Sequence, residues 1–153
     1  MSPDLLPLML FAPVLVFAGA SDLTRMRIPN WTSLAAIGLF VLALPVLGLE
    51  EALWRLAVAG TIFALGLGLW ALRMFGAGDV KLLSALLLLV PVAEIALFWQ
   101  VLSASLLIGL AAVTGLRASG VLRATGWTSM RAHGQFPMGI SIALAGVALP
   151  LVA

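Results

Sequence analysis

The sequence predicts an all-α fold: a polytopic membrane protein with a single domain, residues 1–153, built as a bundle of six transmembrane helices. Composition gives the first indication. Of the 153 residues, 63% are hydrophobic and only 9% are charged, whereas soluble domains have about 45–50% apolar and about 25% charged residues. The second is the alternation of long apolar runs with short polar breaks, since about 20 apolar residues are enough to cross a bilayer.

The first three spans are expected over residues 5–20, 31–49 and 52–74. The first should be retained rather than cleaved as a secretory signal, because no Lys or Arg precedes it. A polar loop, residues 21–30, should follow it. Within this loop Pro29 stops any continuing helix, and Asn30 is a favourable N-cap for the second span. The third span ends at a second polar break, residues 75–79.

The last three spans are expected over residues 80–90, 95–116 and 136–153. The fourth is short, which indicates either little tilt or a loop that dips into the membrane. Pro91 and Glu94 separate it from the fifth. The longest polar stretch, residues 117–135, precedes the sixth span, and Pro137 and Gly139 lie where that last helix begins.

Basic residues gather at one end of this predicted bundle and set its orientation. That end holds seven of the eight: Arg25, Arg27, Arg73, Lys81, Arg117, Arg123 and Arg131. Only Arg55 falls at the other end. Under the positive-inside rule the first end is cytoplasmic and both termini are outside. The net charge of +2 therefore indicates membrane orientation rather than nucleic-acid binding.

Asp22 and Asp79 are the two acidic residues at the cytoplasmic end, and topology puts them at similar depth. An acidic residue near hydrocarbon costs about 2.5–3.5 kcal/mol at a helix centre, so it suggests a function. Two carboxylates that share a site hold one proton, so one can activate water while the other protonates a leaving group. Such chemistry needs no metal or cofactor, which suits a chain with no Cys and one His. Gly76 and Gly78 would let the backbone approach an extended peptide.

Simpler interpretations remain for each residue. Asp22 is also explained as a loop acid that pairs with Arg25 or Arg27, and Asp79 as an N-cap that pairs with Lys81. Lys81 is also explained as a snorkelling cation that sets orientation. For the two acids together, the alternative function is a proton or cation site in a small transporter or channel subunit. A non-catalytic subunit of a secretion or pilus machine is a third possibility.

Three segments resemble the motifs of type IV prepilin peptidases, a family of GxGD intramembrane aspartic proteases. Residues 75–83, Phe-Gly-Ala-Gly-Asp-Val-Lys-Leu-Leu, are similar to the GxGD motif. Residues 22–30, Asp-Leu-Thr-Arg-Met-Arg-Ile-Pro-Asn, resemble the first motif, an aspartate followed by Ile-Pro-Asn. Residues 136–143, Phe-Pro-Met-Gly-Ile-Ser-Ile-Ala, resemble the Pro-x-Gly segment that opens the last helix. In this order they cover nearly the whole chain.

The resemblance implies an endopeptidase of the bacterial inner membrane that cuts prepilin leaders at the cytoplasmic face, just before the apolar helix of the substrate. Asp22 and Asp79 would be the catalytic pair. The same motifs imply an active-site loop and substrate contacts at Gly76, Gly78, Lys81, Pro29, Asn30, Pro137 and Gly139. The partners would be the prepilin and the lipid bilayer, with no nucleic acid, cofactor or metal, and the oligomeric state is left open.

Long members of the family carry a cytosolic region with paired Cys motifs that is associated with N-methylation. This chain has no Cys and resembles the short, CpaA- or TadV-like form that serves Flp-type pili, so no N-methyltransferase activity is expected. Presenilin-like GxGD proteases use a Tyr-Asp motif, and this chain has no Tyr. An archaeal preflagellin peptidase stays open as a near neighbour.

Overall fold

The computed structural model describes residues 3–119 and 136–153. Within these ranges the chain is all-α, as predicted, and contains no strand. The α-helices are α1 (Leu6–Arg25), α2 (Asn30–Ala43), α3 (Leu49–Ala71), α4 (Ala77–Leu87), α5 (Ile95–Ser119) and α7 (Met138–Val152). Two 3-10 helices, η1 (Pro3–Leu5) and η2 (Val92–Glu94), precede α1 and α5. The basic loop residues Arg123 and Arg131 lie outside the described residues.

Three of the described helical segments are long and apolar enough to cross a membrane: Leu6–Arg25, Leu49–Ala71 and Val92–Leu116. The other three predicted spans are shorter, because α2 has 14 residues, α4 has 11 and α7 has 15. At 1.5 Å per residue, α4 covers about 16 Å of a hydrocarbon core about 30 Å thick. The chain is therefore a helical membrane protein in which α4 is an internal helix that does not reach across the bilayer.

The end of α1 differs from the sequence prediction. A loop was expected from residue 21, but α1 continues to Arg25 and places Asp22 within its last turns. No Gly or Pro follows Ala20 until Pro29, so nothing breaks the helix earlier. It ends at Met26, which has left-handed backbone angles (φ 51°, ψ 41°) and donates its N–H to the carbonyl of Asp22. The connection to α2 is therefore only four residues long, 26–29.

The beginnings of α2 and α4 are set by residues other than the predicted caps. Pro29 is the N-cap of α2, in extended conformation, and Asn30 is the first helical residue. The prediction that Asn30 is the N-cap is therefore wrong. Gly76, also extended, is the N-cap of α4, which puts Asp79 in the first turn rather than at the cap. Asp22 and Asp79 therefore both lie inside helices, Asp22 near the end of α1 and Asp79 in the first turn of α4.

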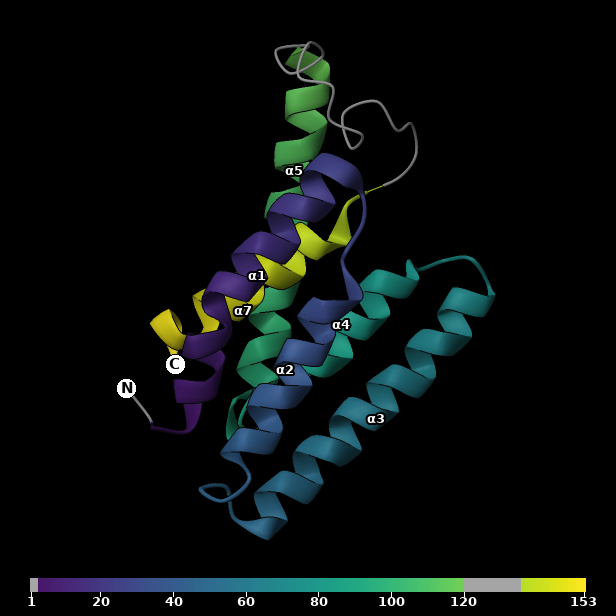
Figure 1. The fold of residues 1–153 in the computed structure, drawn as a ribbon. Coiled ribbons are helices and arrows are strands. Elements are labelled where there is room, and N and C mark those ends of the chain that lie inside the picture. Colours follow the sequence, from purple (N-terminus) through teal and green to yellow (C-terminus); the bar gives the residue numbers. More distant parts are fainter. Residues whose placement is uncertain (1–2, 120–135) are drawn as a thin grey trace.

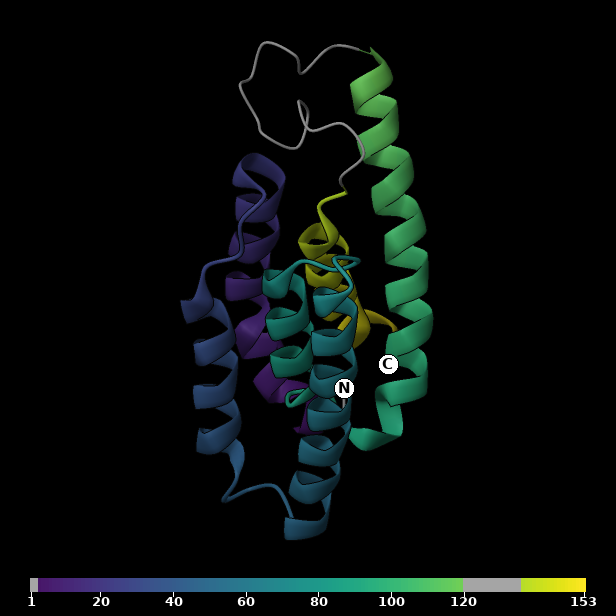
Figure 2. The ribbon, with the colours of Figure 1, turned by 90° about the vertical axis from the view of Figure 1, so that its right-hand side faces the viewer.

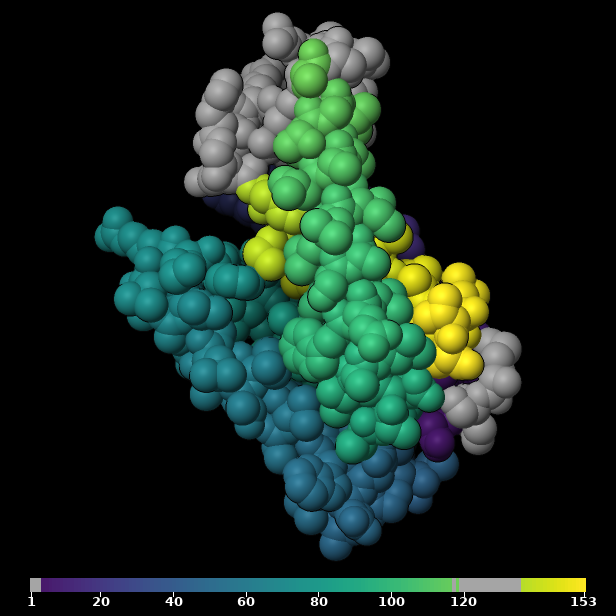
Figure 3. Space-filling model, turned by 180° about the vertical axis from the view of Figure 1, so that it is seen from behind, coloured from purple at the N-terminus to yellow at the C-terminus, as the bar shows by residue number. Residues whose placement is uncertain are grey.

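The helices form two groups, which are joined by contacts of α4 with α7 and of α2 with α1. α1 packs along α7, and α7 packs on α5, while α4 contacts α2, α3 and α7 (Figures 1 and 2). α5 runs along the back face of the molecule (Figure 3). The largest fully buried apolar side chains come mainly from α1 and from α4 with the turn after it, for example Leu8, Leu15, Leu82, Leu86 and Leu89. The short helix α4 is therefore the centre of the core.

Glu51, in the first turn of α3, contacts both the buried Arg55 and the first residue of η2. The Arg55 side chain is 1% exposed, and its Nε donates to Glu51 Oε1 at 2.9 Å. The same carboxylate oxygen accepts the backbone N–H of Val92 at 2.9 Å. The Nη1 and Nη2 atoms of Arg55 have no hydrogen-bond partner in the structure. Because burying an unpaired charge is costly, the ion pair with Glu51 is what stabilises the buried guanidinium of Arg55.

Candidate active site

The ends of four helices meet at one end of the bundle. Figure 1 shows the last turns of α1 above the first turns of α2, α4 and α7, which lie near the middle of the view, whereas the two chain termini lie at the other ends of α1 and α7. This arrangement agrees with the sequence argument that Asp22 and Asp79 lie on the same side, since they belong to the end of α1 and the start of α4.

Asp22 is held by the start of α7. Its Oδ2 accepts the backbone N–H of Gly139 at 2.8 Å, and its side chain is buried. Gly139 is the second residue of α7, where backbone N–H groups have no partner inside the helix. A carboxylate there is stabilised by the hydrogen bond and by the positive end of the helix dipole. This contact joins the first and last motifs of the chain.

Gly139 is required at this position because Asp22 packs directly against it. A Cβ on residue 139 would lie 2.9 Å from Asp22 Oδ2, 3.0 Å from Asp22 Cβ and 2.8 Å from Ile28 Cδ1. Ordinary contacts between carbon atoms are about 3.5–4.0 Å. Any larger residue would therefore push Asp22 away from the first turn of α7.

Asp79 is held by its own helix start. A Cβ on Gly76 would lie 2.6 Å from Asp79 Oδ2, so the carboxylate folds back over the N-cap of α4. Asp79 Oδ1 is buried and has no hydrogen-bond partner in the structure. An unpaired carboxylate oxygen in a buried setting is costly and is typical of a site that binds a ligand or performs chemistry.

Both aspartates line one cavity of about 600 Å³. Its walls come from the end of α1, the connection to α2 and the first turn of α4: Ser21, Asp22, Arg25, Met26, Arg27, Ile28, Pro29, Asn30, Gly76, Ala77, Gly78 and Asp79. Burial raises the pKa of Asp79 to about 7, the negative charge of Asp22 adds to the rise, and a backbone hydrogen bond with Gly76 opposes it. The two carboxylates are thus close enough to influence each other, and near neutral pH Asp79 is on the boundary between its protonated and ionised forms.

Ile28 is a contact that the sequence argument did not single out. Its Cβ would lie 3.2 Å from a Cβ on Gly78, and its Cδ1 2.8 Å from one on Gly139. The side chain therefore fits between two glycines and joins the three motif segments. Its place directly before Pro29 and Asn30 was the available signal, because it is the large β-branched apolar residue of a short connection and lies partly buried against the core.

The remaining predicted site residues divide between two places. Pro29, Asn30, Gly76 and Gly78 line the aspartate cavity. Lys81 does not, because its Nζ donates to Asn30 Oδ1 at 3.2 Å and faces a neighbouring groove.

Pro137 is the N-cap of α7 and does not line the cavity, whereas Gly139 contacts Asp22 from behind. In the part of the chain that the structure describes, no ion pair joins Asp22 to Arg25 or Arg27, or Asp79 to Lys81. The described residues also contain no group of three or more His, Cys, Asp or Glu that could hold a metal ion.

Two carboxylates on one cavity, one of which has its pKa raised to about 7, have the arrangement that general acid–base hydrolysis requires. Comparison with known proteins gives one result. The model of the type IV leader peptidase family matches residues 9–118, which include Asp22 and Asp79 but not Pro137 or Gly139. No curated protein and no solved structure gave a significant match.

Proposed function

Because the chain belongs to the type IV leader peptidase family, we propose that it is an aspartic endopeptidase whose catalytic pair is Asp22 and Asp79. One observation carries the proposal. Both carboxylates line the same cavity, at the ends of α1 and α4. The charge of one raises the pKa of the other, as is typical of paired catalytic carboxylates.

In the proposed reaction, the ionised carboxylate of the pair accepts a proton from water as the water oxygen attacks the scissile carbonyl carbon. The protonated carboxylate donates its proton to the substrate, first to the carbonyl oxygen. The carboxylic acid formed from the first carboxylate then gives its proton to the leaving nitrogen, the carbon–nitrogen bond of the tetrahedral intermediate breaks, and one hydroxyl proton of the former carbonyl carbon returns to the second carboxylate, which leaves a new amino terminus and a carboxylic acid. The pair ends with one proton, as it began, so no other reactant is consumed. Methyl transfer to this terminus is not included in the proposed activity.

The proposed substrates are Flp-type prepilins, cut between a basic cytosolic leader and the apolar helix that follows it. Support comes from the family and from the position of the aspartate cavity at the end of the bundle where basic residues gather. We propose that this end faces the cytosol at the bacterial inner membrane and that both termini lie outside. A transport role is less well supported, because the two acids lie at helix ends and the matched family consists of peptidases.

The test is leader cleavage by the purified protein in liposomes. The wild-type protein should cut a Flp-type prepilin before its apolar helix, and mass spectrometry should find one new amino terminus. Asp22→Asn and Asp79→Asn should each abolish cutting while keeping the helical circular dichroism of the wild type. Asp4→Asn is the matched control, because Asp4 is exposed at the opposite end. Normal cutting by both site variants would refute the proposal.

A further inference from the structure

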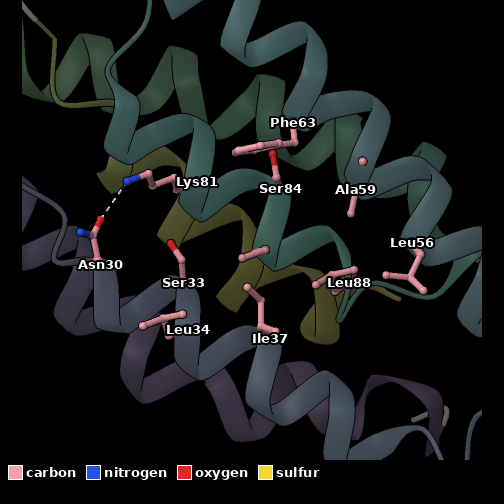
Figure 4. Close-up of a pocket in the computed structure, with 12 residues that line it drawn as sticks. Asn30, Ser33, Leu34, Ile37, Leu56, Ala59, Phe63, Lys81, Ser84 and Leu88 are labelled. Carbon is pink, nitrogen blue, oxygen red and sulfur yellow. Dashed lines mark hydrogen bonds between the residues drawn. The ribbon is translucent and has the colours of Figure 1, made fainter.

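A second cavity adjoins the aspartate cavity. It is a groove of about 590 Å³ with walls on α2 and α3 and its floor on α4 (Figure 4). Its lining is mostly apolar and small: Asn30, Ser33, Leu34, Ile37, Leu56, Ala59, Gly60, Phe63, Lys81, Ser84, Ala85 and Leu88. Leu34, Ile37, Leu56 and Phe63 are exposed in the structure.

Asn30 lines both the groove and the aspartate cavity, so the two lie side by side at the first turn of α2. The side chains at this end are polar, since Lys81 Nζ donates to Asn30 Oδ1 at 3.2 Å (Figure 4). Among the described residues, Lys81 is the only charged one in the groove lining. Leu88, the C-cap of α4, lies about two helical turns beyond Lys81 and lines the other end of the floor. The groove is therefore charged where it meets the aspartates and apolar away from them.

The wall that α3 contributes to the groove contains a glycine, Gly60, with free space next to it. A Cβ on Gly60 would meet nothing within 4 Å, although Gly60 lines the groove. Ala59 is next to it, and Ser84 and Ala85 lie on the floor. Small residues at such positions let another helix approach closely within a membrane.

We propose that this groove binds the apolar helix of the substrate, and that Lys81 pairs with a carboxylate in the first two turns of that helix. This inference rests on the proposed function and adds the substrate-binding surface and a charge preference. A chain that enters from the aspartate cavity passes Asn30 and then lies along α4. Because Lys81 is only two residues beyond Asp79, its partner has to be close to the cut. An ammonium at the cavity end of an apolar groove is complementary to an acidic residue at the start of an apolar helix.

Cross-linking tests the groove without requiring cleavage. The chain has no cysteine, so Gly60→Cys introduces a single thiol into the groove. Gly68→Cys is the matched control, because it is also on α3, is equally open and does not line the groove. The probe is a synthetic single-span peptide with a basic leader, a Gly at the cut and an apolar helix that carries one cysteine. The assay uses the Asp79→Asn background, which keeps the peptide uncut.

Disulfides should form with Gly60→Cys, at peptide positions three or four residues apart on one helical face, and not with Gly68→Cys. Equal cross-linking of both variants, or none with Gly60→Cys, would overturn the proposal that the substrate helix binds in the groove. Lipid chains would then be its occupant. A wild-type protein that cuts no prepilin would instead refute the proposed function, so the two failures are distinguishable.

Kinetics tests the same surface in the active protein. Gly60→Leu should lower kcat/KM for the full peptide, mainly through KM, by about tenfold more than for a peptide truncated after the cut. Gly68→Leu should leave that ratio at the wild-type value. An unchanged ratio in Gly60→Leu would also contradict the proposal.

The charge preference needs its own test. With a glutamate in the first two turns of the peptide helix, Lys81→Glu should raise KM by about fivefold or more, and replacing that glutamate with lysine should restore it. The absence of such rescue would remove Lys81 from the proposal.

Discussion

Replacing Gly139 with alanine tests how the first and last motifs cooperate. The new Cβ would lie 3.0 Å from Asp22 Cβ and 2.8 Å from Ile28 Cδ1, which is about 0.5 Å or more inside ordinary carbon contact. Ile28 Cδ1 is the end of a flexible side chain and can move aside. Asp22 Cβ is bonded to the α1 backbone, so the carboxylate has to move away from the start of α7.

That movement breaks the 2.8 Å hydrogen bond between the Gly139 N–H and Asp22 Oδ2. Hydrogen bonds to charged groups contribute about 1.5–3 kcal/mol. If this stabilisation positions Asp22 for reaction, kcat/KM for prepilin cleavage should fall by about tenfold to a hundredfold. The assay is initial-rate cleavage in liposomes, with the free energy of unfolding measured on the same preparations.

Gly146→Ala is the matched control for this substitution. It is also on α7, and its Cβ would collide with core leucines, Leu15 and Leu86, away from Asp22. It should lose stability by about 1–3 kcal/mol through overpacking but keep its cleavage rate when folded. A folded Gly139→Ala protein with wild-type kcat/KM would refute the idea that α7 positions Asp22.

Three further predictions address Asp79, the shared proton and the opposite end of the bundle. Gly76→Ala should lower kcat by about tenfold or more, because its Cβ would lie 2.6 Å from Asp79 Oδ2; an unchanged kcat would show that this carboxylate can be displaced harmlessly. The cleavage rate should fall as pH rises above about 7, because Asp79 has a pKa of about 7 and the pair then loses its one proton; a rate that keeps rising with pH in a pH–rate profile would contradict the shared proton. Glu51→Ala should lower the free energy of unfolding by about 3 kcal/mol in denaturant titrations, because it leaves Arg55 buried and unpaired. Glu50→Ala, on the same turn, should cost about 0.3–1 kcal/mol, and equal losses from the two variants would rule out the buried ion pair as the cause.

The sequence was sufficient for the all-α class and for expecting the two acids at one end, whereas only three of the six predicted spans are long enough to cross a membrane in the described residues. Apolar runs and polar breaks depend on the hydrophobic effect, which acts along the chain and can be read without a structure. The distribution of Lys and Arg predicted an orientation and, with it, that Asp22 and Asp79 are the acids of one end. Their common cavity agrees with that argument.

The details of the site depended on contacts between distant segments. The hydrogen bond from Gly139 to Asp22 joins α7 to α1, and no local pattern specifies it. α1 continues past Asp22 and ends where Met26 adopts left-handed angles, an end point that composition does not reveal. The bond from Lys81 to Asn30, rather than to Asp79, likewise follows from how α2 packs beside α4. Helix boundaries and side-chain pairing therefore could be known only from the three-dimensional structure.

The measurement that tests the central claim most directly is the residual cleavage rate of Asp22→Asn, Asp79→Asn and the double variant, under single-turnover conditions in liposomes. Two groups that act as one catalytic pair lose their effect together, so all three variants should show the same residual rate. A single variant that keeps the wild-type rate, or a double variant slower than each single variant by the product of their losses, would contradict the account.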